Sequence, residues 1–214
     1  MLGVRSVAFS PDGSRIVSGG GDMKHHAKPG QLRLWDTTSG RLVLDIADHG
    51  AMVYAVAYSP DGSRIASGSG IKDLGQGDHQ GELMIHDAAT GEMISRIEAH
   101  PFSVRTVAFS PDGSRVATAG VDGTAAIWDA ATAGLIVRFK VGDAAVNQLI
   151  FSGDGERVAS CDASGPITIW NARDGSIERS LRGHDGGVLG IAYSPDGRTL
   201  ASVGADQAVR TWSL

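Results

Sequence analysis

The sequence lacks the features that mark several common protein classes. A single cysteine, Cys161, among 214 residues excludes an internal disulfide framework, and we expect it to be a small buried hydrophobe rather than a reactive thiol. The formal net charge of −5 leaves no excess of Lys and Arg for binding nucleic acid or an anionic membrane. There is no apolar run of roughly 18 residues that could span a bilayer, and no basic leader segment. We therefore expect a cytoplasmic protein that contacts neither nucleic acid nor membrane.

What the chain has in quantity is glycine, with 30 residues that fall mainly at recurring turns and in two insertions. An aromatic residue precedes a Ser-Pro-Asp-Gly turn, or its variant Ser-Gly-Asp-Gly, at Phe9, Tyr58, Phe109, Phe151 and Tyr193. These residues are separated by 49, 51, 42 and 42 positions, so the basic period is 42 and the first two units contain insertions of 7 and 9 residues. Repetition from end to end predicts a single domain, 1–214.

Each unit contains short runs of alternating apolar and polar residues between turns, the pattern of half-buried β-strands. In the first unit the predicted strands are 4–10, 15–19, 31–35 and 41–46, with an extended polar loop at 20–30. The second insertion lies at 70–81. The five units are placed at 4–46, 53–97, 104–139, 146–181 and 188–214. The last unit has only three of the four strands.

Short signatures recur in the same phase of the units. Trp-Asp ends the third strand at Trp35-Asp36 and Trp128-Asp129, and Gly183-His184 precedes the last unit. Together with the period of 42, these features resemble the WD40 repeat family of β-propellers. The resemblance implies an all-β propeller of five WD40-type blades, each with four antiparallel strands except a three-stranded last blade. A closed ring, an arc completed by another chain and a piece of a longer propeller all stay open. An arc would leave apolar faces on its end blades.

Two units carry a polar set that matches the hydrogen-bonded His, Ser or Thr, Asp and Trp residues of the family. The sets are His100, Thr118, Asp122 and Trp128, and His184, Ser202, Asp206 and Trp212. A hydroxyl beside a histidine and a carboxylate could also be a hydrolase site. Because the set recurs in two units, we expect a buried structural network and no catalytic residue. The chain is predicted not to be an enzyme.

The insertions contain side chains that could bind a metal ion, namely Asp22, His25, His26, Asp73, Asp78 and His79. They match no strong metal-site spacing, so we predict neither a metal nor another cofactor. By the resemblance, both insertions lie on one rim of the propeller in adjacent blades. Loops on a rigid scaffold often carry binding specificity, which makes His25, His26, Asp78 and His79 possible partner contacts.

One residue near the start of the first strand of each unit is a further candidate contact: Arg5, Tyr54, Arg105, Asn147 and Leu189. The resemblance places these positions near the mouth of the central channel, and Arg and Tyr are common interface anchors. We therefore expect a non-catalytic scaffold for protein or peptide partners, with self-association or a partner chain as ways to complete the propeller. The alternatives are a propeller that binds a small ligand or metal, and a hydrolase or lyase with its site in the central funnel.

Overall fold

The structure, a computed structural model, describes residues 2–22, 29–70 and 80–214. These residues form nineteen strands and no helix, arranged as five antiparallel sheets that we call blades 1 to 5 in chain order. Blade 1 contains β1 (Leu2–Phe9), β2 (Arg15–Asp22), β3 (Gln31–Asp36) and β4 (Leu42–Ile46). Blade 2 contains β5 (Val53–Tyr58), β6 (Arg64–Ser69), β7 (Gly81–Asp87) and β8 (Met93–His100).

The remaining blades repeat this plan. Blade 3 contains β9 (Val104–Phe109), β10 (Arg115–Gly120), β11 (Thr124–Asp129) and β12 (Leu135–Lys140). Blade 4 contains β13 (Val146–Phe151), β14 (Arg157–Asp162), β15 (Ile167–Asn171) and β16 (Ile177–Leu181). Blade 5 contains β17 (Val188–Tyr193), β18 (Thr199–Gly204) and β19 (Val209–Ser213). The prediction of an all-β fold with five blades, the last of them three-stranded, is confirmed.

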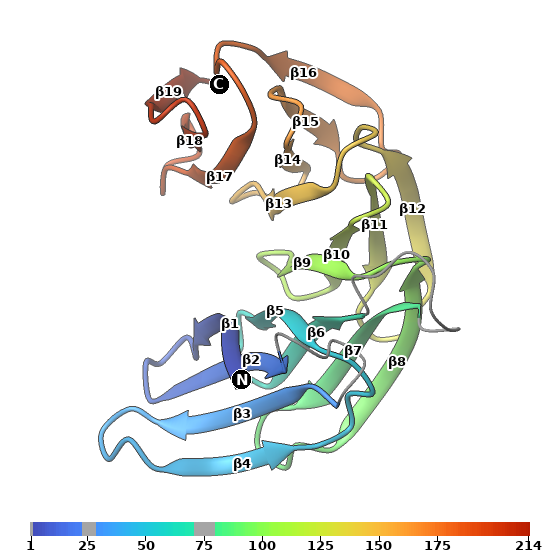
Figure 1. The fold of residues 1–214 in the computed structure, drawn as a ribbon, viewed down its shortest axis with the longest axis vertical. Helices are drawn as coiled ribbons and strands as arrows, with labels where there is room; N and C mark the ends of the chain where they lie inside the picture. Colours follow the sequence, from blue (N-terminus) through green and yellow to red (C-terminus); the bar gives the residue numbers. More distant parts are fainter. Residues whose placement is uncertain (1, 23–28, 71–79) are drawn as a thin grey trace.

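Each blade is a series of hairpins with its strands in chain order. The first strands of the blades, β1, β5, β9, β13 and β17, lie side by side along the inside of an arc (Figure 1). The fourth strands, β4, β8, β12 and β16, lie on its outside (Figure 1). The sheets therefore stack face to face, as propeller blades do.

The turn between the first and second strands follows from its residues. In blade 1, Asp12 accepts hydrogen bonds from the Ser10 hydroxyl at 2.6 Å and the Ser14 amide at 3.0 Å. The Gly13 amide donates to the Ser10 carbonyl at 2.9 Å, and its φ of 71° is a conformation that favours glycine. The same turn recurs in every blade, so all five turns lie on one edge of the arc, which we call the turn rim.

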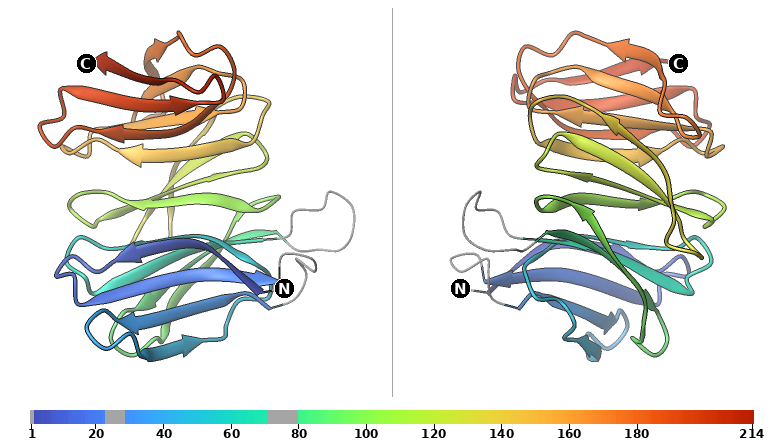
Figure 2. Two further views of the ribbon diagram at one scale, coloured as in Figure 1. Left: turned by 60° about the vertical axis from the view of Figure 1, so that its left-hand side comes forward. Right: turned by 90° about the vertical axis from the view of Figure 1, so that its right-hand side faces the viewer.

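The connections from second to third strands lie on the opposite edge, together with the starts of the first strands (Figure 2). We call this edge the insertion rim, because both insertions of the sequence fall there.

The core lies between neighbouring blades. Between blades 1 and 2, Val17, Leu32 and Leu34 are fully buried and pack against Val53 and Val56 of the next blade. Equivalent clusters fill the next three junctions. Burial of one such side chain contributes roughly 1.5–3 kcal/mol, so the repeated faces supply most of the stabilisation.

Small residues in the second strands let the blades approach closely. A Cβ at Gly68 would lie 2.6 Å from Val104 Cγ1 in blade 3, closer than real Cβ contacts. Blades 3 and 4 have Ala119 and Cys161 at this position, both fully buried. Burial raises the pKa of the Cys161 thiol to about 12, so this side chain serves packing and is unreactive.

Two predicted boundaries in blade 1 were wrong, because β1 begins at Leu2 instead of residue 4 and β2 ends at Asp22 instead of residue 19. The pattern assigned 20–30 to a polar loop, but β2 continues through this stretch as far as Asp22. The reason is non-local, because β1 begins early enough to pair with these residues, Gly20 lying opposite Val4. A Cβ at Gly20 would lie 2.2 Å from the Gly3 carbonyl oxygen, so glycine here permits close strand approach.

The arc does not close. Blades 1 and 5 lie at its two ends, with the other three blades between them (Figure 1). Val7 of β1 is 63% exposed and Val209 of β19 is 74% exposed, whereas the residues that hold these places in the interior blades are buried. A ring closed by this chain alone, which the sequence left open, is not found.

Candidate functional site

Every first strand carries a β-bulge at the same place, close to the insertion rim. In each of the five, the pairing with the second strand skips one residue. The skipped residues are Arg5, Tyr54, Arg105, Asn147 and Leu189, the five positions selected from the sequence. A bulge redirects the side chain of its extra residue. The bulges therefore set one side chain per blade along the inside of the arc.

The five bulge residues differ in what they offer to a partner. Arg5 is exposed, and its guanidinium lies 6.0 Å from the centre of the Tyr54 ring. Tyr54 itself is only 9% exposed. The Asn147 amide donates to the Val188 carbonyl at 2.8 Å, which ties blade 4 to blade 5.

Two more bulge residues are accessible. Leu189 is 59% exposed. The Arg105 side chain is partly exposed, while its Nε atom is buried and has no hydrogen-bond partner among the described residues. Arg5, Arg105 and Leu189 are thus the bulge residues with side chains available to a ligand.

The other candidate contacts, His25, His26, Asp78 and His79, lie outside the described residues, as does Asp73. The backbone that flanks the insertions is fixed. Asp22 is buried at the end of β2, and the Gly30 amide donates to the His49 carbonyl at 3.0 Å. In blade 2 the Gly70 amide donates to the Met52 carbonyl at 3.2 Å.

The structure brings the polar set of blade 3 together. His100 Nε2 lies 2.9 Å from Thr118 Oγ1, and the Trp128 indole donates to the same hydroxyl at 2.9 Å. His100 Nδ1 lies 3.2 Å from Asp122 Oδ2. The set links the end of β8 to β10, β11 and the turn between them.

Blade 5 has the same arrangement. His184 Nε2 lies 2.8 Å from Ser202 Oγ, and the Trp212 indole donates to that hydroxyl at 2.9 Å. His184 Nδ1 lies 2.8 Å from Asp206 Oδ1. The recurrence places both sets at equivalent positions in the fold.

Both carboxylates are ionised at neutral pH. Burial opposes ionisation of Asp122, but hydrogen bonds from His100 and Thr124 outweigh it and lower its pKa to about 2. Hydrogen bonds from His184 and then from the Asp185 amide hold the pKa of Asp206 below its usual range. An ionised carboxylate only accepts hydrogen bonds, so each histidine donates to it from Nδ1.

This geometry does not suit nucleophilic catalysis. Thr118 is fully buried and Ser202 is 1% exposed, so neither hydroxyl can meet a substrate. Each hydroxyl is also held in place by a hydrogen bond that it accepts from an indole of the neighbouring strand. The arrangement instead pairs polar groups that would be costly to leave unsatisfied.

Sequence reasoning missed a third histidine of this type, His49. Its Nε2 lies 2.7 Å from Ser67 Oγ, and the side chain is 1% exposed. The histidine and the hydroxyl are 18 residues apart, the same separation as in blades 3 and 5. That spacing is the signal that could have identified it.

His86 stands in blade 2 where other blades have Trp. It is fully buried, its ring centre lies 5.6 Å from that of His49, and neither ring nitrogen has a hydrogen-bond partner among the described residues. The Asp48 carboxylate lies 3.6 Å from Nε2, beyond hydrogen-bond distance. Burial lowers the pKa of His86, and burial together with repulsion from His86 lowers the pKa of His49 to about 3. Both rings are therefore neutral at neutral pH.

Blades 1 and 4 keep only part of the set. The Trp35 indole donates to Ser18 Oγ at 2.8 Å, and the Trp170 indole donates to Ser160 Oγ at 2.8 Å. The indole–hydroxyl pair thus joins the second and third strands in four blades, and a histidine is added to the hydroxyl in blades 2, 3 and 5.

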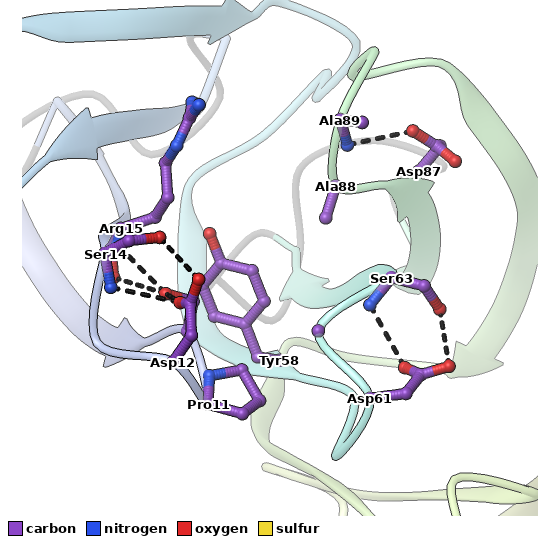
Figure 3. Close-up of a pocket in the computed structure, with 12 residues that line it drawn as sticks. Pro11, Asp12, Ser14, Arg15, Tyr58, Asp61, Ser63, Asp87, Ala88 and Ala89 are labelled. Atoms are coloured by element: carbon purple, nitrogen blue, oxygen red, sulfur yellow. Dashed lines mark hydrogen bonds between the residues drawn. The ribbon is translucent and has the colours of Figure 1, made fainter.

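A cavity of about 460 Å³ lies on the turn rim between blades 1 and 2, a feature that the sequence did not predict (Figure 3). Arg15, Tyr58 and three aspartates, Asp12, Asp61 and Asp87, are among its lining residues. Hydrogen bonds from the Ser10 hydroxyl and from Ser14 lower the pKa of Asp12 to about 2. The aspartates already accept hydrogen bonds within their own turns, as the dashed lines of Figure 3 show.

The cavity has a simple structural cause. At the next junction the Arg64 guanidinium donates to the Gly113 carbonyl at 2.7 Å and lies over the Phe109 ring at 5.5 Å. Arg115 donates to the Gly155 carbonyl in the same manner at 2.6 Å. Arg15 makes no comparable hydrogen bond to a described residue, and its side chain extends away from the Asp61 turn (Figure 3).

Other kinds of site find no support in the described part of the chain. Residues 2–22, 29–70 and 80–214 contain no cluster of three or more His, Cys, Asp or Glu side chains that could hold a metal ion. Across the same residues there is no helix that could cross a membrane.

Comparison with known proteins identifies the family. No curated protein matches the chain. The family model described as "WD domain, G-beta repeat" (WD40) matches it four times, at residues 2–36, 40–73, 91–129 and 175–213. The matches cover more than half of the chain and omit 130–174, which contains most of blade 4, where Trp170 is followed by Asn171 instead of Asp. With the five stacked sheets, these matches show that the chain belongs to the WD40 repeat family.

Proposed function

We propose that this chain is a non-catalytic scaffold that binds protein or peptide partners along the inside of its arc, next to the insertion rim. WD40 repeats generally mediate protein–protein interaction, and they are generally not enzymes. The observation that carries the finer proposal is the bulge repeated in all five first strands. It aligns Arg5, Arg105 and Leu189 as accessible side chains on a rigid inner surface.

The accessible side chains define the chemistry of the partner. Two guanidinium groups favour carboxylates, because their N–H groups match the two oxygens of a carboxylate. Leu189 adds an exposed apolar contact in blade 5. A peptide that carries acidic and apolar side chains fits this combination best. The insertions of blades 1 and 2 leave the same rim and would add contacts beside it.

The alternatives of a hydrolase or lyase and of a small-ligand or metal propeller have no observation of their own in their favour. The recurring polar sets are buried and mutually paired, and the turn-rim cavity owes its shape to the position of one arginine side chain. Neither feature presents a reacting group to a substrate.

A peptide display library selected on the purified chain tests the proposal. The enriched peptides are then measured against Arg105→Ala combined with Leu189→Ala. We expect acidic and apolar residues among the peptides, and an affinity loss of at least about tenfold, because truncating an interface anchor costs about 2 kcal/mol or more.

The matched control is Arg41→Ala combined with Ile177→Ala, an exposed arginine and an exposed aliphatic residue away from the bulges. These changes should leave peptide affinity unchanged. Equal loss in both double variants, or no loss in the bulge variant, would contradict the proposal.

A further inference from the structure

The first blade exposes an apolar face that is buried everywhere else in the arc. Val4, Val7 and Phe9 are 65%, 63% and 65% exposed. Their counterparts in blade 2 pack against blade 1, with Val53 fully buried and Val56 7% exposed. We call Val4, Val7, Phe9 and Ile16 the leading face of the arc. In the interior of the molecule this kind of face always meets the preceding blade.

The last blade exposes the opposite kind of face. Val203 and Val209 are 44% and 74% exposed, and Ala201 and Thr211 lie beside them on the same side of the sheet. We call these four residues the trailing face. Their counterparts in blade 3 are Ala117, Ala119, Ala125 and Ile127, all fully buried against blade 4. A hollow of about 250 Å³, lined in part by Ala192, Ala201 and Val203, remains on the trailing face.

We infer that the trailing face of one copy of this chain packs against the leading face of a second copy. Each of the four junctions within the chain joins a trailing-type face to a leading-type face, so the two free faces are the separated halves of one established interface. Apolar sheet faces of this kind mark interaction surfaces. The occupant is a second copy because every chain carries both halves.

The contact is directional. A leading face does not match another leading face, so the association is head to tail and uses different surfaces on the two copies. It uses the apolar faces of the two end blades, whereas the proposed partner site uses the bulge side chains along the inside of the arc.

The contact is also weaker than the junctions within the chain. Thr211 takes the place of the buried Ile127, and Val203 is larger than the Ala119 of blade 3 at the point of closest approach. Blade 5 also has no fourth strand among the described residues to extend the face. The association is therefore reversible and depends on protein concentration.

Sedimentation velocity over a range of concentrations tests the inference. The chain should associate as its concentration rises. Val7→Asp on the leading face and Val209→Asp on the trailing face should each be monomeric alone, because each removes one half of the inferred contact. Mixed together they should form a one-to-one dimer, since each variant keeps the half that the other lacks.

Ile177→Asp, at an exposed position on the outer strand β16, should associate like the unchanged chain. Circular dichroism checks that every variant is folded, and Val4→Asp replaces Val7→Asp if the latter unfolds. A chain that stays monomeric at all concentrations overturns the inference. So does a single variant that still associates alone, or a mixture of the two variants that stays monomeric.

Discussion

His49, His100 and His184 hold the same place in three blades, each with its Nε2 within 2.9 Å of a hydroxyl of the second strand. Their second ring nitrogens differ. Asp122 and Asp206 pair with Nδ1 of His100 and His184, whereas Nδ1 of His49 has no partner among the described residues. The same position therefore belongs to a satisfied network in blades 3 and 5 and to an incomplete one in blade 2.

We predict that Asp122→Ala and His184→Ala each lower the free energy of unfolding by about 1–3 kcal/mol, because each leaves a buried partner unsatisfied. Chemical denaturation measures the change. The control is Asp143→Ala. Asp143 is a fully exposed carboxylate, so its removal should change the free energy of unfolding little. Unchanged unfolding of both network variants would show that these sets do not stabilise the fold.

A second prediction concerns acid stability. The pKa of buried His49 is about 3, against an ordinary value of 6.5, so the unfolded chain takes up a proton that the folded chain does not. His49 therefore does not lower the free energy of unfolding above pH 6.5. As the pH falls from 6.5 towards 3, it lowers the free energy of unfolding by up to about 1.4 kcal/mol per pH unit. His49→Gln removes this titration and should give a flatter decline.

The comparison is made by denaturation between pH 6.5 and 4. In this window the lowered pKa values of Asp122 and Asp206 have little effect, because their stabilisation is lost only as the pH falls through their ordinary value of 3.8 and below. His86 titrates in both proteins, so the difference between the two slopes reports His49. Equal slopes would show that His49 does not control acid stability.

Among the secondary-structure elements, the strands were predictable because each buries one face and exposes the other. Such strands have alternating apolar and polar residues in the sequence. The end of β2 was not predictable from the local sequence. Gly20 pairs with Val4, and that pairing is decided by the neighbouring strand, so local composition pointed to a loop. The bulges share this origin, since a skipped residue exists only relative to its partner strand.

The candidate site was predictable in position more than in chemistry. Resemblance selected all five bulge residues, but Tyr54 is buried and Asn147 is hydrogen-bonded to the next blade. Such differences depend on how blades pack, which no single unit of the sequence contains. The turn-rim cavity depends on the orientation of the Arg15 side chain. The position of Arg15 in the repeat does not determine that orientation.

At the scale of the molecule, the repeat determined the number of blades but not closure. Each interface adds a small rotation between sheets, and the sum of these rotations decides whether the ends meet. The structure is an open arc, and the faces at its two ends expose Val7 and Val209. The molecule is thus an open stack of five equivalent sheets.

Thiol labelling distinguishes the open arc from a closed ring. Cys161 is buried with its pKa raised to about 12, so the unchanged chain should react little. In dilute solution, Val7→Cys and Val209→Cys should react with a maleimide as fast as the exposed control Ile177→Cys, and far faster than the buried control Val56→Cys. Protection of both end-face cysteines at every dilution would mean that the chain closes on itself, and would contradict the open arc.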